Sequence, residues 1–255
     1  DTLANPAFTE NGKLRQFDMI VANPPYSVNQ WSRAAFEFDK YGRNILGVPP
    51  QARADYAFFQ HILLSMKGMT ERCAKEKTGR CAILFPHGVL FRSEERQMRE
   101  KLVRSDLLDC VIGLGPNLFY NSPMEACIVI CRAEKPDTHK NHVLFINALN
   151  EVTRKNARSY LEPQHIERIS KAYNAYKTEE GFAKKVSIRD IEKNDFSLNI
   201  PLYVQVATDE TKEQDTRSVQ ECYDDWYASS LALRECHKNL NVLLKDVREK
   251  NTIPF

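Results

Sequence analysis

The chain has 255 residues, of which 42% are hydrophobic, enough to fill the core of one large domain or of one domain with an appendage. Its 36 Lys and Arg nearly balance its 34 Asp and Glu, which excludes a global basic field of the kind that indicates nucleic acid, although a local basic surface or a partner subunit could supply phosphate contacts. No apolar stretch is long enough to span a bilayer and no signal peptide is visible, which predicts a cytoplasmic protein without a membrane partner.

Alternating strands and helices are expected in the first 150 residues. Apolar runs that end at Pro, Gly or polar residues predict strands over 17–22, 81–85, 109–112 and 126–131, with a further edge strand at 143–146. Helical spacing of apolar residues predicts helices over 53–66 and 94–103. The first of these strands is expected to be buried, and the third and fourth to pair as neighbours. Such alternation favours an α/β fold with a parallel sheet that becomes less regular toward its later strands.

The pattern changes after Leu161. A helix is expected over 164–176, a short mixed segment over 186–191 and extended chain around Pro201 in 198–206. The almost entirely polar residues 208–218 predict a linker or an exposed arm. From Val219 to Val247, a seam at alternating steps of four and three residues predicts an amphipathic helix, imperfect at Ser230 and His237. This helix either docks on a partner or packs on the core of the same chain.

The seven cysteines include no Cys-x-x-Cys pair. Several lie within apolar runs, as in 126–131. This pattern favours reduced thiols packed as small hydrophobes over a disulfide framework or a zinc site, so no metal is expected.

The most informative motif is the tetrad Asn23-Pro24-Pro25-Tyr26 at the end of the first predicted strand. A Pro-Pro pair after a strand can be only a turn. The tetrad also suits methylation of a planar exocyclic amine, whose lone pair is delocalised into its ring. Two acceptors against the two N–H bonds would restore that lone pair, and the Asn23 side-chain oxygen and the Pro24 carbonyl can supply them.

The other two positions of the tetrad complete this chemistry. Both prolines fix φ and lack an N–H, so the loop presents its acceptors rigidly. Tyr26 offers an aromatic face to a base that has left its duplex stack. The end of a strand also fits, because open α/β sheets bind ligands at the carboxyl ends of their strands. Asp18, inside the strand, is interpreted as structural.

Five stretches of this chain, the tetrad included, resemble the modification (methyltransferase) subunits of type I restriction-modification systems. The resemblance covers roughly residues 1 to 206, and the matching stretches are 17–27, 54–61, 85–92, 111–120 and 198–204. It implies transfer of a methyl group from S-adenosyl-L-methionine to N6 of adenine in DNA. It also implies a complex with a specificity subunit that reads the sequence and with a restriction subunit.

The same resemblance assigns roles to individual residues. By analogy, Asn23 and Pro24, with Pro25 beside them, form the catalytic loop that binds the target amino group. Tyr26 would stack on the flipped adenine, and Phe119, in the loop between the third and fourth strands, resembles a second aromatic against that base. Phe119 as a core aromatic is the alternative.

Three residues are implied at the cofactor. Phe58 resembles the aromatic that packs on the cofactor's adenine, with core packing on its helix face as the alternative. Asp1 is similar to the acidic residue that bonds the cofactor's adenine amine, and Asn23 borders the same site.

One departure from that family is large. Its members carry a glycine-rich cofactor loop upstream of the tetrad, whereas only Gly12 precedes Asn23 here. The pair Gly113 and Gly115 lacks a following helix start and is interpreted as the family's own loop. The expectation is therefore a fragment without the first strands: a partial Rossmann-like methyltransferase sheet with helices on both faces, followed by a mostly helical C-terminal extension.

The expected domains are the C-terminal part of the catalytic domain (1–150), a mixed extension packed on it (151–206), a polar linker (207–218) and a docking helix (219–250). Two alternatives to a DNA methyltransferase subunit stay open. One is the same chemistry on a protein glutamine or an RNA adenine. The other is a non-catalytic assembly module that binds the specificity subunit.

Overall fold

The computed structural model describes residues 1–69, 77–119, 124–155, 158–205 and 218–250, the last ten of these by their helical backbone alone. The chain divides into two compact units, 1–207 and 208–255, and each is described by itself.

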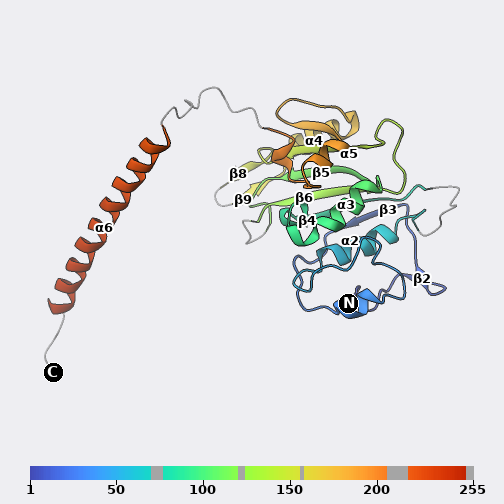
Figure 1. The fold of residues 1–255 in the computed structure, drawn as a ribbon, viewed down its shortest axis with the longest axis horizontal. Helices are drawn as coiled ribbons and strands as arrows, with labels where there is room; N and C mark the ends of the chain where they lie inside the picture. The colour runs from blue at the N-terminus through green and yellow to red at the C-terminus, as the bar shows by residue number, and fades with distance from the viewer. Residues whose placement is uncertain (70–76, 120–123, 156–157, 206–217, 251–255) are drawn as a thin grey trace. The chain divides into compact units, whose positions relative to one another are not determined.

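A six-stranded sheet forms the centre of the first unit (Figure 1). Its strand order is β10-β7-β5-β6-β4-β3. The strands are β3 (Met19–Ala22), β4 (Arg80–Pro86), β5 (Leu108–Leu114), β6 (Ala126–Arg132), β7 (His142–Ala148) and β10 (Ala183–Ser187). The pairs β3–β4 and β5–β7 are parallel, and the other three are antiparallel. The α/β class is confirmed and β5 and β6 are neighbours as predicted, but the sheet is mixed and not parallel.

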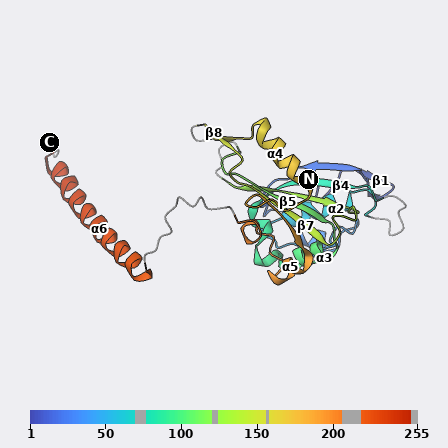
Figure 2. The ribbon, with the colours of Figure 1, turned by 90° about the horizontal axis from the view of Figure 1, so that it is seen from above.

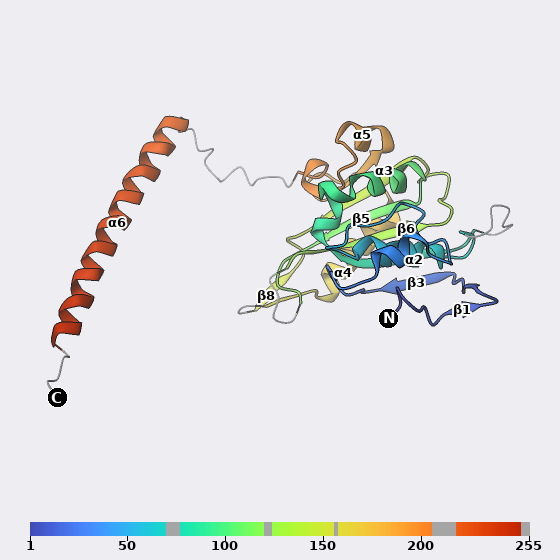
Figure 3. The same cartoon turned by 60° about the horizontal axis from the view of Figure 1, so that its bottom comes forward.

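Helices cover both faces of this sheet. Side chains of α2 (Asp55–Leu64), α3 (Arg96–Arg104) and α5 (Ile188–Lys193) belong to the main buried cluster on one face. Helix α4 (Pro163–Ala175) contributes Ala172 to a second cluster with β5 and β7. Figures 2 and 3 show α4 on the opposite side of the sheet from α3 and α5.

Shorter elements connect these layers. They are the helix α1 (Arg33–Glu37), the 3₁₀ turns at His87–Leu90, Ser93–Glu95 and Ile200–Leu202, and the strand pairs β1 (Thr9–Glu10) with β2 (Lys13–Leu14) and β8 (Thr153–Lys155) with β9 (Arg158–Tyr160).

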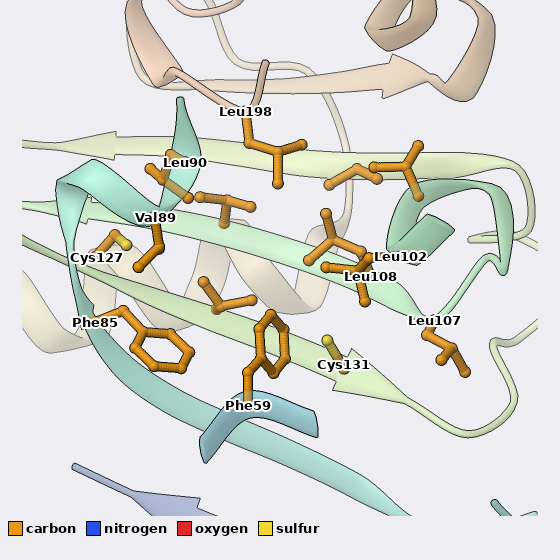
Figure 4. Packing of buried hydrophobic residues seen from close by; sticks show 14 of the residues in the cluster. Phe59, Phe85, Val89, Leu90, Leu102, Leu107, Leu108, Cys127, Cys131 and Leu198 are labelled. Atoms are coloured by element: carbon orange, nitrogen blue, oxygen red, sulfur yellow. The ribbon is translucent and has the colours of Figure 1, made fainter. Parts of the chain in front are cut away.

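The main core lies between the sheet and helices α2 and α3 (Figure 4). Phe59 of α2 packs against Phe85 of β4, with ring centroids 5.3 Å apart. Cys127 and Cys131 of β6 are buried, free thiols in the same cluster. The expectation that apolar-run cysteines pack as small hydrophobes is confirmed at these two positions.

Three predictions about individual strands were wrong. The strand before the tetrad forms, but β3 is an edge strand and Val21 is 78% exposed, so it is not buried. The predicted edge strand β7 lies between β5 and β10 and is almost wholly buried. The segment around Pro201 forms a 3₁₀ turn that buries Ile200 in the core and is not extended throughout.

The second unit contains the helix α6 (Val219–Lys250). It carries exposed apolar and aromatic side chains, and Trp226 is 62% exposed. The predicted linker at 207–218 lies outside the described residues apart from Ser218. Within the described part of the chain, the helices are too short or too polar to cross a membrane.

Candidate active site

The tetrad leaves the sheet at the carboxyl end of β3. Because β3 and β4 run parallel, the segment that begins at His87, after β4, leaves the sheet at the same end as the tetrad. Asn23 and Pro25 are exposed, whereas Pro24 and Tyr26 are half-buried. No hydrogen bond joins the Asn23 amide to another described residue, so its oxygen is open to an external donor.

Tyr26 and Phe119 come together although they lie far apart in the sequence. Their ring centroids are 6.3 Å apart with the planes at 87°, an edge-to-face arrangement. The Tyr26 hydroxyl is buried and makes no hydrogen bond within the described structure. Burial, with smaller contributions from Cys127 and Asp55, raises the pKa of Tyr26 above its ordinary value. The pair therefore sets a second aromatic ring, that of Phe119, next to the last residue of the tetrad.

A buried carboxylate holds the chain directly after the tetrad. Ser27 has a φ of 51°, and its N–H donates to Asp55 Oδ1 at 2.7 Å. Arg92 Nη1 donates to Asp55 Oδ2, also at 2.7 Å. Sequence reasoning identified neither Asp55 nor Arg92 as part of the site. Their local signals, an acid in the first turn of a helix and a basic residue in a loop, are common and point to no specific partner.

Gly113 and Gly115 lie where neighbouring atoms pack closely against the backbone. A Cβ at Gly113 would lie 2.6 Å from Ile200 Cδ1, and one at Gly115 would lie 2.7 Å from the Leu149 carbonyl oxygen. The backbone oxygen leaves no room for a Cβ at Gly115, whereas a Cβ at Gly113 would require the buried Ile200 side chain to move. Gly113 lies within β5, which agrees with the interpretation that this pair is not a cofactor fingerprint.

His87 lies next to Gly113 at this end of the sheet. Its Nε2 is buried without a hydrogen bond in the described structure, and its Nδ1 is 3.5 Å from Glu125 Oε2. Burial lowers the pKa of His87 more than Glu125 raises it. The imidazole is therefore neutral at neutral pH.

Phe58 and the segment that carries Asp1 lie together at the start of α2. Phe58 is half-buried and packs in a small cluster that includes Leu3 and Phe36. Buried Arg43 donates to the carbonyls of Thr2 and Leu3, which fixes this segment. Asp1 Oδ1 accepts from the N–H of Leu3 at 2.9 Å, so part of its acceptor capacity is already used.

Asp18 is exposed and has local partners. Thr78 Oγ1 donates to its carboxylate at 2.6 Å, and Lys67 Nζ is 3.3 Å away. These contacts lower the pKa of Asp18 below its ordinary value. Its partners connect the start of β3 to neighbouring segments, which agrees with the structural interpretation. Among the described residues, no cluster of three or more His, Cys, Asp or Glu could hold a metal ion.

Comparison with known proteins identifies the family. The family model described as N-6 DNA methylase matches residues 1–213. The MjaVIII methylase subunit of the type I restriction enzyme from Methanocaldococcus jannaschii is 33% identical over 231 residues, which are 87% of this chain and 38% of that protein. The MpnII methylase subunit from Mycoplasma pneumoniae is 27% identical over 96% of this chain and 42% of its own length.

A solved structure shares the fold. The type I restriction-modification methyltransferase subunit from Streptococcus thermophilus superimposes with a TM-score of 0.70 at 32% identity, over 80% of this chain and 41% of that one. The chain thus spans about two fifths of the length of the relatives it matches. With the tetrad at the end of β3 and the family model covering most of its residues, the chain belongs to the N-6 DNA methylase family.

Proposed function

We propose that the enzyme containing this chain transfers a methyl group from S-adenosyl-L-methionine to N6 of adenine in DNA, and that this chain supplies the side of the site that binds the adenine. The observation that carries the proposal is the edge-to-face pair of Phe119 with Tyr26, three residues after the exposed Asn23. A flipped base needs aromatic surface in place of its lost neighbours, and its amine needs acceptors beside that surface.

The acceptor loop acts on the amine through two oxygens. Asn23 Oδ1 and the Pro24 carbonyl each accept one N–H of the amino group, which favours a pyramidal nitrogen with its lone pair free. That nitrogen gains a methyl group and loses one proton. The prolines hold both acceptors in place before the base arrives, so little reorganisation accompanies the reaction.

The described residues fit the nucleoside part of S-adenosyl-L-methionine. When bound, this cofactor supplies an electrophilic methyl group. Phe58 offers a half-buried ring, and Arg43 holds the segment of Asp1 against the same cluster. Asp1 would accept from the adenine amine with the acceptor capacity that Leu3 leaves, and Asn23, directly after β3, would border the site by analogy with the family.

Substitution of Asn23 tests this proposal. In the intact enzyme, Asn23→Ala should lower the methylation rate by a factor of about 100 to 1,000, the usual loss for one preorganised hydrogen-bonding group. Cofactor affinity, measured by calorimetric titration, should stay within about threefold, because cofactor binding draws on other residues as well. Full methylation activity in Asn23→Ala would contradict the role of this loop.

A partner-binding role for α6 is the second part of the proposal. The relatives are subunits of type I restriction enzymes, so a specificity subunit and a restriction subunit are the proposed partners along with DNA. Tyr223, Trp226 and Tyr227 stand exposed on α6, with the Tyr223 ring 5.8 Å from Trp226 and 6.3 Å from Tyr227. Exposed aromatic clusters of this kind favour burial against another protein.

A further inference from the structure

The loop that carries the tetrad is tied to the body of the protein by one carboxylate. Asp55 is the first residue of α2 and is only 1% exposed. Its Oδ1 accepts from the backbone N–H of Ser27 at 2.7 Å, one residue beyond Tyr26. Ser27 has a φ of 51°, which is uncommon for a residue with a Cβ. A charge-assisted hydrogen bond at this point stabilises a backbone turn that would otherwise be unfavourable.

Arg92 neutralises that carboxylate from the other side. Its Nη1 donates to Asp55 Oδ2 at 2.7 Å, and its side chain is mostly buried. A Cβ on Gly88 would collide with the Arg92 guanidinium, so glycine at this position makes room for the ion pair. Arg99 Nη1 in turn donates to the Arg92 carbonyl at 2.7 Å. A continuous series of contacts therefore runs from α3 through Arg92 and Asp55 to Ser27.

Glu95 is a second carboxyl group near the same nitrogen of Arg92. It is 0% exposed, and neither carboxylate oxygen has a hydrogen bond in the described structure. Its Oε1 is 3.6 Å from Arg92 Nη1, a longer contact than the one Arg92 makes with Asp55. Burial raises the pKa of Glu95 to about 7 against the lowering effect of Arg92. A protonated Glu95 leaves the Arg92 charge to Asp55.

We infer that Asp55 and Arg92 are positioning residues, which hold the acceptor loop Asn23–Tyr26 at the carboxyl end of β3 in the geometry that binds the target amine. The inference rests on the proposed function, because the loop's chemistry is proposed there. Neither side chain touches the reacting atoms. They act on Ser27, the residue that fixes the exit of the loop, and a shift of about 1 Å in such a loop can cost a factor of about 100 in rate.

Two measurements test the inference. In the intact enzyme, Arg92→Ala should lower kcat by a factor of about 10 to 100, while KM for S-adenosyl-L-methionine stays within about threefold. Arg92→Lys keeps the cation without the forked donor and should retain an intermediate rate. In the 255-residue chain, hydrogen exchange at the amide of Ser27 should be faster in Arg92→Ala than in the wild type.

Arg53→Ala is the matched control. Arg53 pairs with Glu94 at 2.9 Å close to the same network, but its side chain is 37% exposed, against 17% for Arg92. Loss of the Arg53 side chain should change neither kcat nor the hydrogen exchange at Ser27. If Arg92→Ala fails to fold, Asp55→Asn, which keeps the shape of the side chain but removes its charge, takes its place with the same expectations.

The outcomes separate this inference from the proposed function. Unchanged kcat and unchanged Ser27 exchange in Arg92→Ala would overturn the positioning role, and so would an equal loss of kcat, cofactor binding and thermal stability. A wild-type enzyme that methylates no adenine would instead overturn the proposed function. The exchange measurement on the chain would then still decide whether Arg92 holds the loop.

Discussion

At the scale of single residues, the proposed site combines exposed acceptor groups with buried side chains that hold them in position. Asn23 is exposed and Pro24 half-exposed, as expected for groups that meet a substrate. The hydroxyl of Tyr26 is buried without a partner, so the ring and not the hydroxyl is the part suited to a base. This distinction leads to a paired prediction.

Tyr26→Phe should keep the methylation rate of the intact enzyme within about threefold, because the ring survives and no hydrogen bond is lost. Tyr26→Ala should lower affinity for the flipped adenine by a factor of about 10 to 100, since one base–aromatic stack is worth about 1–3 kcal/mol. The fluorescence of 2-aminopurine at the target position measures the flipped state. Equal losses in both variants would show that the hydroxyl, and not the stacking ring, is what the site uses.

A second prediction at this scale concerns the buried Glu95. An acid whose pKa rises on folding keeps its proton longer in the native state, so stability falls as pH rises from its ordinary pKa of 4.5 to about 7. The contribution of Glu95 to this fall is on the order of 3 kcal/mol, at about 1.4 kcal/mol per pKa unit. Glu95→Gln should remove it.

Denaturant unfolding of the chain at several pH values measures this effect as the difference between wild type and Glu95→Gln. The stability of the wild type relative to the variant should decline between pH 4.5 and about 7 and then level off. A difference that is constant across this range would show that Glu95 ionises as an ordinary exposed acid.

Among the site residues, the resemblance to methyltransferase subunits implied that Tyr26 and Phe119 face the same base, and the structure brings their rings within 6.3 Å of each other. Sequence reasoning could not find Asp55 and Arg92. Asp55 bonds to Ser27 and to Arg92 because of how α2 and the turn after β4 pack, and hydrogen bonds between residues 28 and 37 positions apart leave no local pattern in the sequence.

At the scale of elements, local sequence patterns predicted where the strands lie, but not which of them are edge strands or how deeply each is buried. The run before the tetrad is apolar enough for a buried strand, yet β3 pairs only with β4 in the described structure. The run at 143–146 predicted an edge strand, yet β10 pairs with it on its outer side. Strand order decides burial, and it depends on long-range pairing that alternation of side chains does not encode.

The prediction for this scale is that the aromatic side chains of α6 bind the specificity subunit. Tyr223 and Trp226 share the apolar seam of this helix, and Asn239 lies on the opposite side by helical spacing. The double variant Tyr223→Glu with Trp226→Glu should weaken association with the specificity subunit by at least about tenfold, because buried aromatics dominate interfaces. Methylation should fall in parallel.

Asn239→Glu is the control, since it adds a negative charge on the other side of the helix and should leave association unchanged. Sedimentation or calorimetry with the purified specificity subunit measures both. If the aromatic double variant binds as tightly as the wild type, the seam of α6 does not form that interface.

At the scale of the whole molecule, the described part of the chain holds the adenine side of the proposed site more completely than the cofactor side. The rings of Tyr26 and Phe119 meet at the segment after β3, whereas Gly12 is the only glycine before the tetrad. The chain covers about two fifths of its methylase relatives. The activity proposed here therefore belongs to the enzyme that contains this chain, working with its partner subunits.

The central claim is that this enzyme methylates N6 of adenine in DNA through the loop Asn23–Tyr26. Mass spectrometry of nucleosides from DNA treated with the intact enzyme, its specificity subunit and isotopically labelled S-adenosyl-L-methionine tests it most directly. Labelled N6-methyladenine is expected with the wild type, and only a trace of it with Asn23→Ala. Label on cytosine alone, or on RNA or a protein glutamine but not on DNA, would contradict it.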